Sequence, residues 1–146
     1  MMAKKPDSDC SCVIDTNGLH ELATASGNLK ATLIAHLEDG TIGVPSWALQ
    51  ELRELYEDEA KEIGPHITKR IQLSTHVEVR AARITEELHL GFSRGAYDSH
   101  VERHTAAVAL NKGYIVLTSA DNIDAYDGMQ CTVKDLAGWA EEVALS

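Results

Sequence analysis

Short apolar runs in this chain stop abruptly at small polar or acidic residues, and each is followed by a segment with helical spacing. Strands are expected at 11–14, 41–44, 114–118 and 130–133. Helices are expected between and after them, at 18–24, 29–38, 45–59, 67–73, 77–88, 98–111 and 135–143. Strands that alternate with helices are typical of a mainly parallel sheet with both faces covered. The sequence therefore predicts a three-layer α/β/α sandwich with a mainly parallel central sheet.

Size and composition predict one soluble unit. Residues 1–10 are polar and are expected to form a flexible lead-in, and residues 11–146 a single domain without repeats or linkers. Apolar residues make up 44% of the chain and charged residues 25%, as in soluble globular proteins. No apolar run suits a membrane span or a signal peptide, and three cysteines without paired spacing fit a reducing compartment. We expect a cytoplasmic protein that contacts no membrane.

The first strand ends at an acid, Asp15, followed by two small polar residues. In open α/β folds, ligands bind in the crevice at the carboxyl ends of the parallel strands. Asp121 follows the strand at 114–118 in a similar way, within a polar loop expected at 119–128. Neutral oxygens that can orient water or a ligand accompany these two acids, at Thr16, Asn17, Thr118 and Ser119.

Two helices are expected to carry further acids to the same edge. Glu51 lies early in the helix at 45–59, beside apolar core candidates. Asp98 and Glu102 lie four residues apart, and so on one face of the alanine-rich helix at 98–111. Simpler interpretations stay open, because a helical glutamate usually faces water and Asp98 could cap its helix.

Several converging carboxylates favour a particular chemistry. They repel one another unless a cation lies between them, and Mg²⁺ or Mn²⁺ prefers oxygen ligands. Two such ions, about 3.5–4 Å apart, can clamp a phosphodiester during hydrolysis. The chain has no serine-hydrolase elbow, Walker loop, zinc-protease motif or dinucleotide fingerprint. Metal-assisted phosphodiester hydrolysis is therefore the favoured chemistry if the acids converge.

The net charge of −10 argues against a simple nucleic-acid-binding protein, because neutralising phosphates requires clustered lysines and arginines. Bound divalent cations would offset part of this charge. Seven positive residues lie between positions 61 and 103, which is compatible with a basic rim around an acidic pocket: Lys61, Lys69, Arg70, Arg80, Arg83, Arg94 and Arg103.

Four ordered motifs, covering essentially the whole chain after residue 10, resemble a PIN domain. They are Val-Ile-Asp-Thr-Asn (13–17), Val-Pro-Ser-x-x-x-x-Glu-Leu (44–52), Glu-x-x-x-x-Ala-x-Ala-Leu-x-x-Gly (102–113) and Ile-Val-Leu-Thr-Ser-Ala-Asp (115–121). The resemblance implies a single-strand-selective ribonuclease site with Mg²⁺ or Mn²⁺ held by four acids, which here are Asp15, Glu51, Glu102 and Asp121.

Two of these positions depart from the family pattern. Glu102 stands where the family usually has aspartate, so Asp98, one turn earlier, is a second candidate for the third ligand. Asp121 is one residue later than the commonest spacing. The resemblance also implies a VapC-like toxin with a cognate antitoxin, a homodimer and an RNA substrate, for which Arg94 and Arg103 are the expected contacts.

Two other classes of function compete with the ribonuclease interpretation. A PIN-like module that has lost most of its catalysis would bind RNA or a protein partner. A phosphatase or phospho-acceptor receiver would use Asp15 as its nucleophile, but such phosphatases need Asp-x-Asp and the chain reads Asp15-Thr16-Asn17. The leading hypothesis is the metal-dependent endoribonuclease.

Overall fold

Five parallel strands form one sheet in the order β3-β2-β1-β4-β5. The computed structural model describes residues 11–87 and 100–145, so the expected lead-in at 1–10 and the expected loop at 91–95 lie outside the described residues. The predicted parallel sheet is confirmed. Its strands are β1 Cys12–Ile14, β2 Ile42–Pro45, β3 Arg70–Ile71, β4 Ile115–Thr118 and β5 Val133–Asp135.

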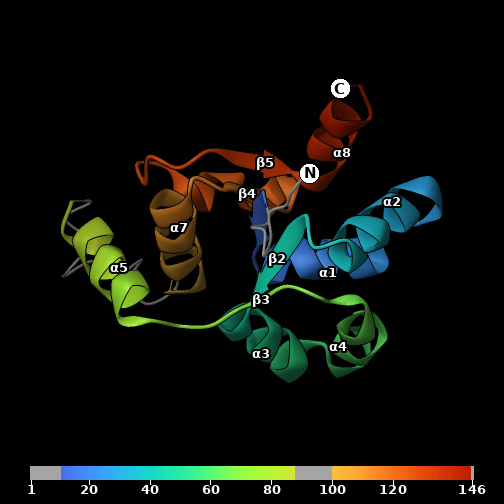
Figure 1. Cartoon of the computed structure of the whole chain (residues 1–146), viewed down its shortest axis with the longest axis horizontal. Coiled ribbons are helices and arrows are strands. Elements are labelled where there is room, and N and C mark those ends of the chain that lie inside the picture. The colour runs from blue at the N-terminus through green and yellow to red at the C-terminus, as the bar shows by residue number, and fades with distance from the viewer. Residues whose placement is uncertain (1–10, 88–99, 146) are drawn as a thin grey trace, which may run out of the picture.

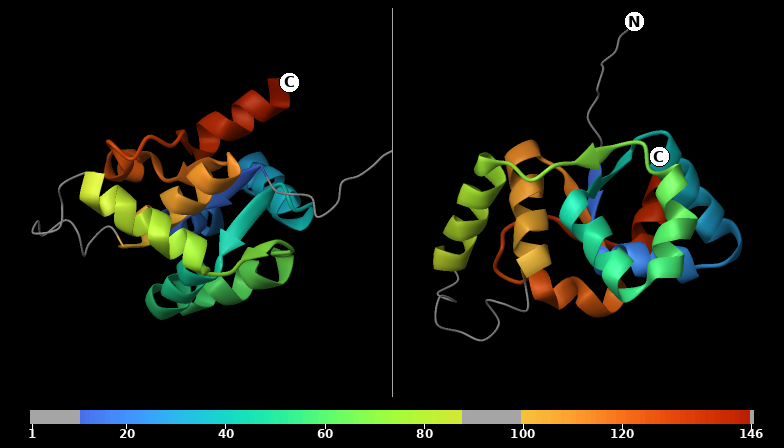
Figure 2. Two further views of the ribbon diagram at one scale, coloured as in Figure 1. Left: turned by 60° about the vertical axis from the view of Figure 1, so that its left-hand side comes forward. Right: turned by 90° about the horizontal axis from the view of Figure 1, so that it is seen from below.

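Helices cover both faces of this sheet, with α5 and α7 on one side and α1 to α4 on the other (Figure 1), and the views in Figure 2 show the same division. The predicted three-layer sandwich is confirmed. None of the helices in the described part has the length and apolar character needed to cross a membrane. The bounds are α1 Thr16–Thr24, α2 Gly27–Glu38, α3 Ser46–Leu55, α4 Glu57–Ile63, α5 Thr75–Glu87, α7 His100–Lys112 and α8 Leu136–Leu145, with the 3₁₀ helices η1 Gly64–His66 and η2 Ala120–Tyr126.

Successive residues of β1 enter two different apolar cores, because side chains alternate between the faces of a strand. Cys12 and Ile14 pack with residues of α1, α2, α3 and α8, whereas Val13 packs with α5 and α7. The α7 side of this second core is built from small buried residues, including Ala106 and Ala107. The small side chains let α7 lie close to the sheet, and the first turn of α7 then reaches the carboxyl ends of the strands.

The prediction of a helix at 67–73 is wrong. This segment is extended and contributes β3, which pairs in parallel with β2. The backbone N–H of Val44 donates to the carbonyl of Lys69 at 2.9 Å. A segment this short gains more from pairing with the free edge of a sheet than from one or two helical turns, since helix nucleation is costly.

Two other elements differ in their limits. The helix predicted at 45–59 is broken at Tyr56, whose φ of −142° and ψ of 71° separate α3 from α4. The strand predicted at 130–133 is shifted to β5, where it pairs in register with β4. Within the polar loop predicted at 119–128, residues 120–126 form η2.

Candidate functional site

Asp15 is fully buried at the carboxyl end of β1, where the strand gives way to α1. Its backbone N–H donates to the carbonyl of Leu117 on β4 at 3.2 Å. Its Oδ1 accepts from the backbone N–H of Gly18 at 2.7 Å, so Asp15 is the N-cap of α1. The free N–H groups and the dipole at a helix start both favour a carboxylate there. The residue therefore lies at the ligand-binding edge of the sheet, as its pattern predicted.

Gly18 allows α1 to begin this close to the sheet. A Cβ at position 18 would lie 2.7 Å from Cγ1 of Ile14 and 2.8 Å from the carbonyl oxygen of Leu117. The second contact is with backbone, which cannot rotate away. A side chain at this position would displace α1 and lengthen the hydrogen bond by which Asp15 caps α1.

The other oxygen of Asp15, Oδ2, accepts three hydrogen bonds. Thr118 Oγ1 donates at 2.7 Å, the Tyr126 hydroxyl at 2.6 Å and Asn122 Nδ2 at 3.2 Å. Thr118 ends β4, and the other two donors belong to η2. These contacts hold the carboxylate in one orientation, with partners from the neighbouring strand and the segment that follows it.

Asn122 also joins Asp15 to a second acid. Its Nδ2 donates to Oε2 of Glu102 at 3.1 Å and lies 3.1 Å from Oγ1 of Thr118. Glu102 comes from the first turn of α7 and is only 8% exposed. One amide group therefore lies between two buried carboxylates, and these are two of the four acids predicted from the sequence.

The buried pair carries an electrostatic cost. Burial raises the pKa of Asp15 from 3.8 to about 6 and the negative charge of Glu102 adds to the rise, while hydrogen bonds from Tyr126, Gly18 and Thr118 oppose it. Burial, and then the charge of Asp15, also raise the pKa of the Tyr126 hydroxyl well above its usual value. A positive charge near Asp15 and Glu102 would lower this cost, because desolvation and like charges both disfavour ionised acids.

The other two predicted acids are not joined to this pair. Glu51 is partly exposed on α3 and forms no hydrogen bond or ion pair with any described residue. Asp121 is exposed at the start of η2, and its charge raises the pKa of Glu21. Within 11–87 and 100–145, no three Asp, Glu, His or Cys side chains are grouped so that they could hold one ion. The predicted convergence of four acids at one point is therefore not found there, and Asp98 lies outside the described residues.

A hollow of about 300 Å³ opens beside Asn122 at the same edge of the sheet. Residues of α1 form one wall, and the segment after β4 forms the other. Two of the predicted neutral groups, Asn17 and Ser119, lie in these walls. The lining residues are Asn17, His20, Glu21, Thr24, Ser119, Asp121 and Asn122.

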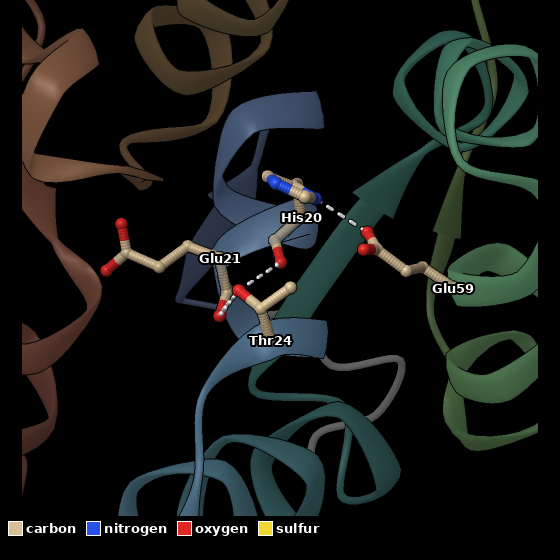
Figure 3. Close-up of polar contacts among 4 residues, drawn as sticks. All are labelled: His20, Glu21, Thr24 and Glu59. Atoms are coloured by element: carbon tan, nitrogen blue, oxygen red, sulfur yellow. Dashed lines mark hydrogen bonds and ion pairs between the residues drawn. The ribbon is translucent and has the colours of Figure 1, made fainter.

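Figure 3 shows how α1 presents its side chains around this hollow. His20 points toward α4, where its Nδ1 lies 2.7 Å from Oε1 of Glu59, and its ring stacks on Tyr56 with centroids 4.0 Å apart. Glu21 points the other way. Burial, followed by the charges of Asp135 and Asp121, raises the pKa of Glu21, and a hydrogen bond from the Ala120 backbone opposes the rise. The rim is therefore acidic on the side of η2.

The remaining candidates have different positions. Thr16 is buried and donates to the carbonyl of Ala48 at 3.4 Å, which ties α1 to α3 instead of facing a ligand. Arg103 is only 6% exposed, and its assignment as an RNA contact is corrected, because a side chain buried in the domain cannot reach a phosphate in solvent. Arg94 lies outside the described residues.

Sequence reasoning missed Asn122, Tyr126 and Glu21. Thr118, Asn122 and Tyr126 recur every four residues, but this spacing defines one side of an α-helix, whereas Thr118 ends β4 and η2 is a 3₁₀ helix. The segment was expected to be an irregular loop, in which such spacing has no meaning. Glu21 gave no signal, because the predicted helix at 18–24 left its orientation open.

Comparison with solved structures identifies the fold. PAE2754 from Pyrobaculum aerophilum matches with a TM-score of 0.64 and 15% identity, over 94% of this chain and 99% of that one. DNA-bound VapBC from Salmonella typhimurium matches with a TM-score of 0.68 and 15% identity, over 87% and 98%. VapBC2 from Rickettsia felis, bound to a promoter DNA fragment, matches with a TM-score of 0.62 and 12% identity, over 85% and 97%.

These matches confirm the predicted PIN-like fold over most of the chain. At this level of identity the likeness concerns the fold. No protein-family model matches the chain, and no curated protein sequence matches it.

Proposed function

We propose that this protein is a metal-dependent endoribonuclease that cleaves single-stranded RNA. The observation that carries the proposal is the pairing of Asp15 and Glu102 through Asn122 at the carboxyl edge of a parallel sheet. Two buried carboxylates at such an edge form a local negative site that suits a hard cation. The alternative nucleophilic role for Asp15 is disfavoured, because its Oδ2 is enclosed by three hydrogen-bond donors.

The residues present fit one Mg²⁺ or Mn²⁺ ion. Such ions are commonly held by one or two carboxylates, with waters and substrate phosphate completing the ligand set. Asp15 and Glu102 supply the two carboxylates, and Asn122 keeps them together. When bound, the ion would activate water and neutralise charge on the scissile phosphate. We assign no second ion, because the described residues hold no group of three or more side chains that could bind a metal.

The surrounding residues position Asp15. Thr118 and Tyr126 donate to Oδ2 and Gly18 donates to Oδ1, so the carboxylate has no free rotation. Their hydrogen bonds favour the ionised form against the effect of burial. Oδ1 accepts one hydrogen bond and Oδ2 accepts three, so Oδ1 is the oxygen of Asp15 with capacity left for an ion.

We also propose that the protein is the toxin of a toxin–antitoxin pair and that it forms a homodimer. Two of the solved structures that share its fold are VapBC complexes bound to DNA, and they match 97–98% of their own chain lengths. This supports a small cognate antitoxin as partner. Expression of the wild-type chain should arrest bacterial growth, and expression of Asp15→Asn should not.

The test of the enzymatic proposal is cleavage of labelled single-stranded RNA with Mg²⁺ or Mn²⁺, with EDTA as the negative control. Asp15→Asn and Glu102→Gln should each lower the rate on the order of 100-fold or more, because each removes one ligand of a shared site. Glu51→Gln has a matched control on the same helix, Glu54→Gln. If Glu51 is a ligand in the loaded enzyme, only its own variant loses activity. Cleavage that survives EDTA or Asp15→Asn would refute the mechanism.

Two observations favour a second candidate, a PIN-like binding module without catalysis. Three donors already occupy Oδ2 of Asp15, and the described residues hold no group of three metal-binding side chains. In this case the same experiment would give RNA binding that resists EDTA, with no cleavage under any metal condition.

A further inference from the structure

We propose that a basic groove between α5 and α7 binds the phosphodiester backbone of single-stranded RNA outside the acidic site. The α5–α7 groove is defined by two adjoining hollows of about 320 and 440 Å³, which share His76, Arg80 and Asn111. Arg83 lines the first hollow and Lys112 the second. The choice of RNA as ligand rests on the proposed function.

The pattern of α5 produces this groove. Val77, Ala81 and Ile84 are buried and pack toward α7, at the i, i+4, i+7 spacing of one helix face. His76, Val79, Arg80 and Arg83 have the corresponding spacing on a neighbouring face. His76, Arg80 and Arg83 therefore lie along one face of α5, and the exposed Val79 lies beside them.

One of these arginines is held in place. Arg80 Nε donates to Oδ1 of Asn111 on α7 at 3.0 Å, and Nδ2 of Asn111 donates to the carbonyl of His76 at 3.4 Å. This leaves the two terminal nitrogens of the Arg80 guanidinium available at the groove. A guanidinium fixed in this way loses little side-chain entropy when it binds an anion, and its fork geometry suits a phosphate.

Among the described side chains, the positive charges of the groove lack acidic partners, in contrast to three lysines on other elements. Arg80, Arg83 and Lys112 form no ion pair with any of the side chains that the structure describes, those of residues 11–86 and 101–143. By contrast, three lysines on other elements are each within 3.5 Å of a glutamate, in the pairs Lys30–Glu62, Lys61–Glu57 and Lys134–Glu142. In a chain of net charge −10, unpaired cations gathered on one face mark a place where an anion is attracted.

The groove lies at the opposite end of α7 from the acidic site. Lys112 ends the helix in which Glu102 occupies the first turn, so the two positions are separated by ten residues, roughly 15 Å along the axis. Figure 1 shows α5 and α7 side by side at the flank of the sheet. A few RNA nucleotides beyond the scissile phosphate span this distance. The groove would bind the phosphates of this RNA by charge, without recognising the base sequence.

The experiment measures binding of a fluorescent single-stranded RNA in EDTA, where no metal-dependent cleavage occurs. The triple variant Arg80→Gln, Arg83→Gln, Lys112→Gln is compared with a control that loses the same charge elsewhere, Lys30→Gln, Lys61→Gln, Lys134→Gln. Each lost phosphate contact should reduce the slope of log Kobs against log[salt] by about 0.7, so the groove variant should lose about 2 and bind about tenfold or more weakly. The control variant should keep most of its affinity and slope.

Several outcomes would overturn the proposal. They are equal losses in both variants, an unchanged salt slope in the groove variant, or no RNA binding by the wild-type protein. Tight binding of a polyglutamate peptide that depends on these three residues, without RNA binding, would assign the groove to an acidic protein segment. Arg83→Gln alone, at an exposed position, provides the same test if the triple variant does not fold.

Failure of the groove and failure of the enzymatic proposal give different results. RNA binding that depends on the groove, without any cleavage, would support the groove as an RNA-binding site and refute the proposal that the protein is a ribonuclease. If wild type and groove variant cleave long RNA with the same KM, the proposal that the groove binds RNA is refuted, and the proposal of ribonuclease activity is supported.

Discussion

The metal-free protein should lose stability as the pH rises from about 4 to 7, and Asp15→Asn should remove most of this loss. The pKa of Asp15 is 3.8 in the unfolded reference and about 6 in the folded protein, mainly because the carboxyl group is buried. Between these values the unfolded chain has released the proton while the folded protein retains it. The unfolded state therefore binds fewer protons, and the free energy of unfolding falls with pH.

The magnitude follows from the pKa difference. One pKa unit corresponds to 1.36 kcal/mol, so ionisation of Asp15 costs the folded state about 3 kcal/mol at neutral pH. Asparagine cannot ionise and has no such dependence. Its amide would face the N–H of Gly18 and leave a donor unpaired, a loss of about 1–3 kcal/mol that is the same at every pH.

The measurement is urea unfolding in EDTA at a series of pH values from 4 to 8, for wild type and Asp15→Asn. The difference in unfolding free energy between the two proteins should change by about 3 kcal/mol in favour of the variant as the pH rises. Titrating groups that do not interact with Asp15 contribute equally to both proteins and cancel. A difference that stays constant within 0.5 kcal/mol or so across this range would refute the claim that Asp15 ionises inside a desolvated site.

Three further results are expected. Tyr126→Phe removes the 2.6 Å hydrogen bond to Asp15 and should destabilise the protein by about 1.5–3 kcal/mol at pH 8, measured by urea unfolding, and should move the Asp15 transition to higher pH. Gly18→Ala forces a Cβ against the Leu117 carbonyl, so it should cost about 1–3 kcal/mol in the same assay; a neutral effect would show that α1 can shift freely. Mn²⁺ at about 100 times its Kd should stabilise the wild type by about 2.7 kcal/mol, seen as a rise in Tm, and an equal rise in Glu102→Gln would place the ion elsewhere.

The sequence predicted the architecture because its central strands are strongly marked. Apolar runs that end in polar residues located β1, β2 and β4, and the first of these runs also placed Asp15 at the carboxyl end of β1. β3 was not predictable in the same way. It has two residues, neither of them buried, and its conformation is decided by the free edge of β2. Local pattern carries little information where a distant partner determines the structure.

The candidate site was only partly predictable for a related reason. A strand end fixes where Asp15 lies, but which side chains surround it depends on how the segment after β4 folds back. The helical turns of η2 bring Asn122 and Tyr126 to Asp15, although neither is acidic and both were passed over. Arg103 was expected to contact RNA because it is one of several positive residues in the middle of the chain, but charge alone does not show that its side chain is buried.

The partners of Asp15 are far away in the chain. The three side chains that donate to its Oδ2 are separated from it by 103, 107 and 111 residues. Contacts of such high sequence separation form late, since the loop between them must close before they contribute any energy. On the ribosome, the acid emerges early, but the three donors to its Oδ2 are complete only when synthesis has passed residue 126. A nascent or truncated chain that ends before η2 cannot assemble the site, so the completed protein and not its fragments would have the activity.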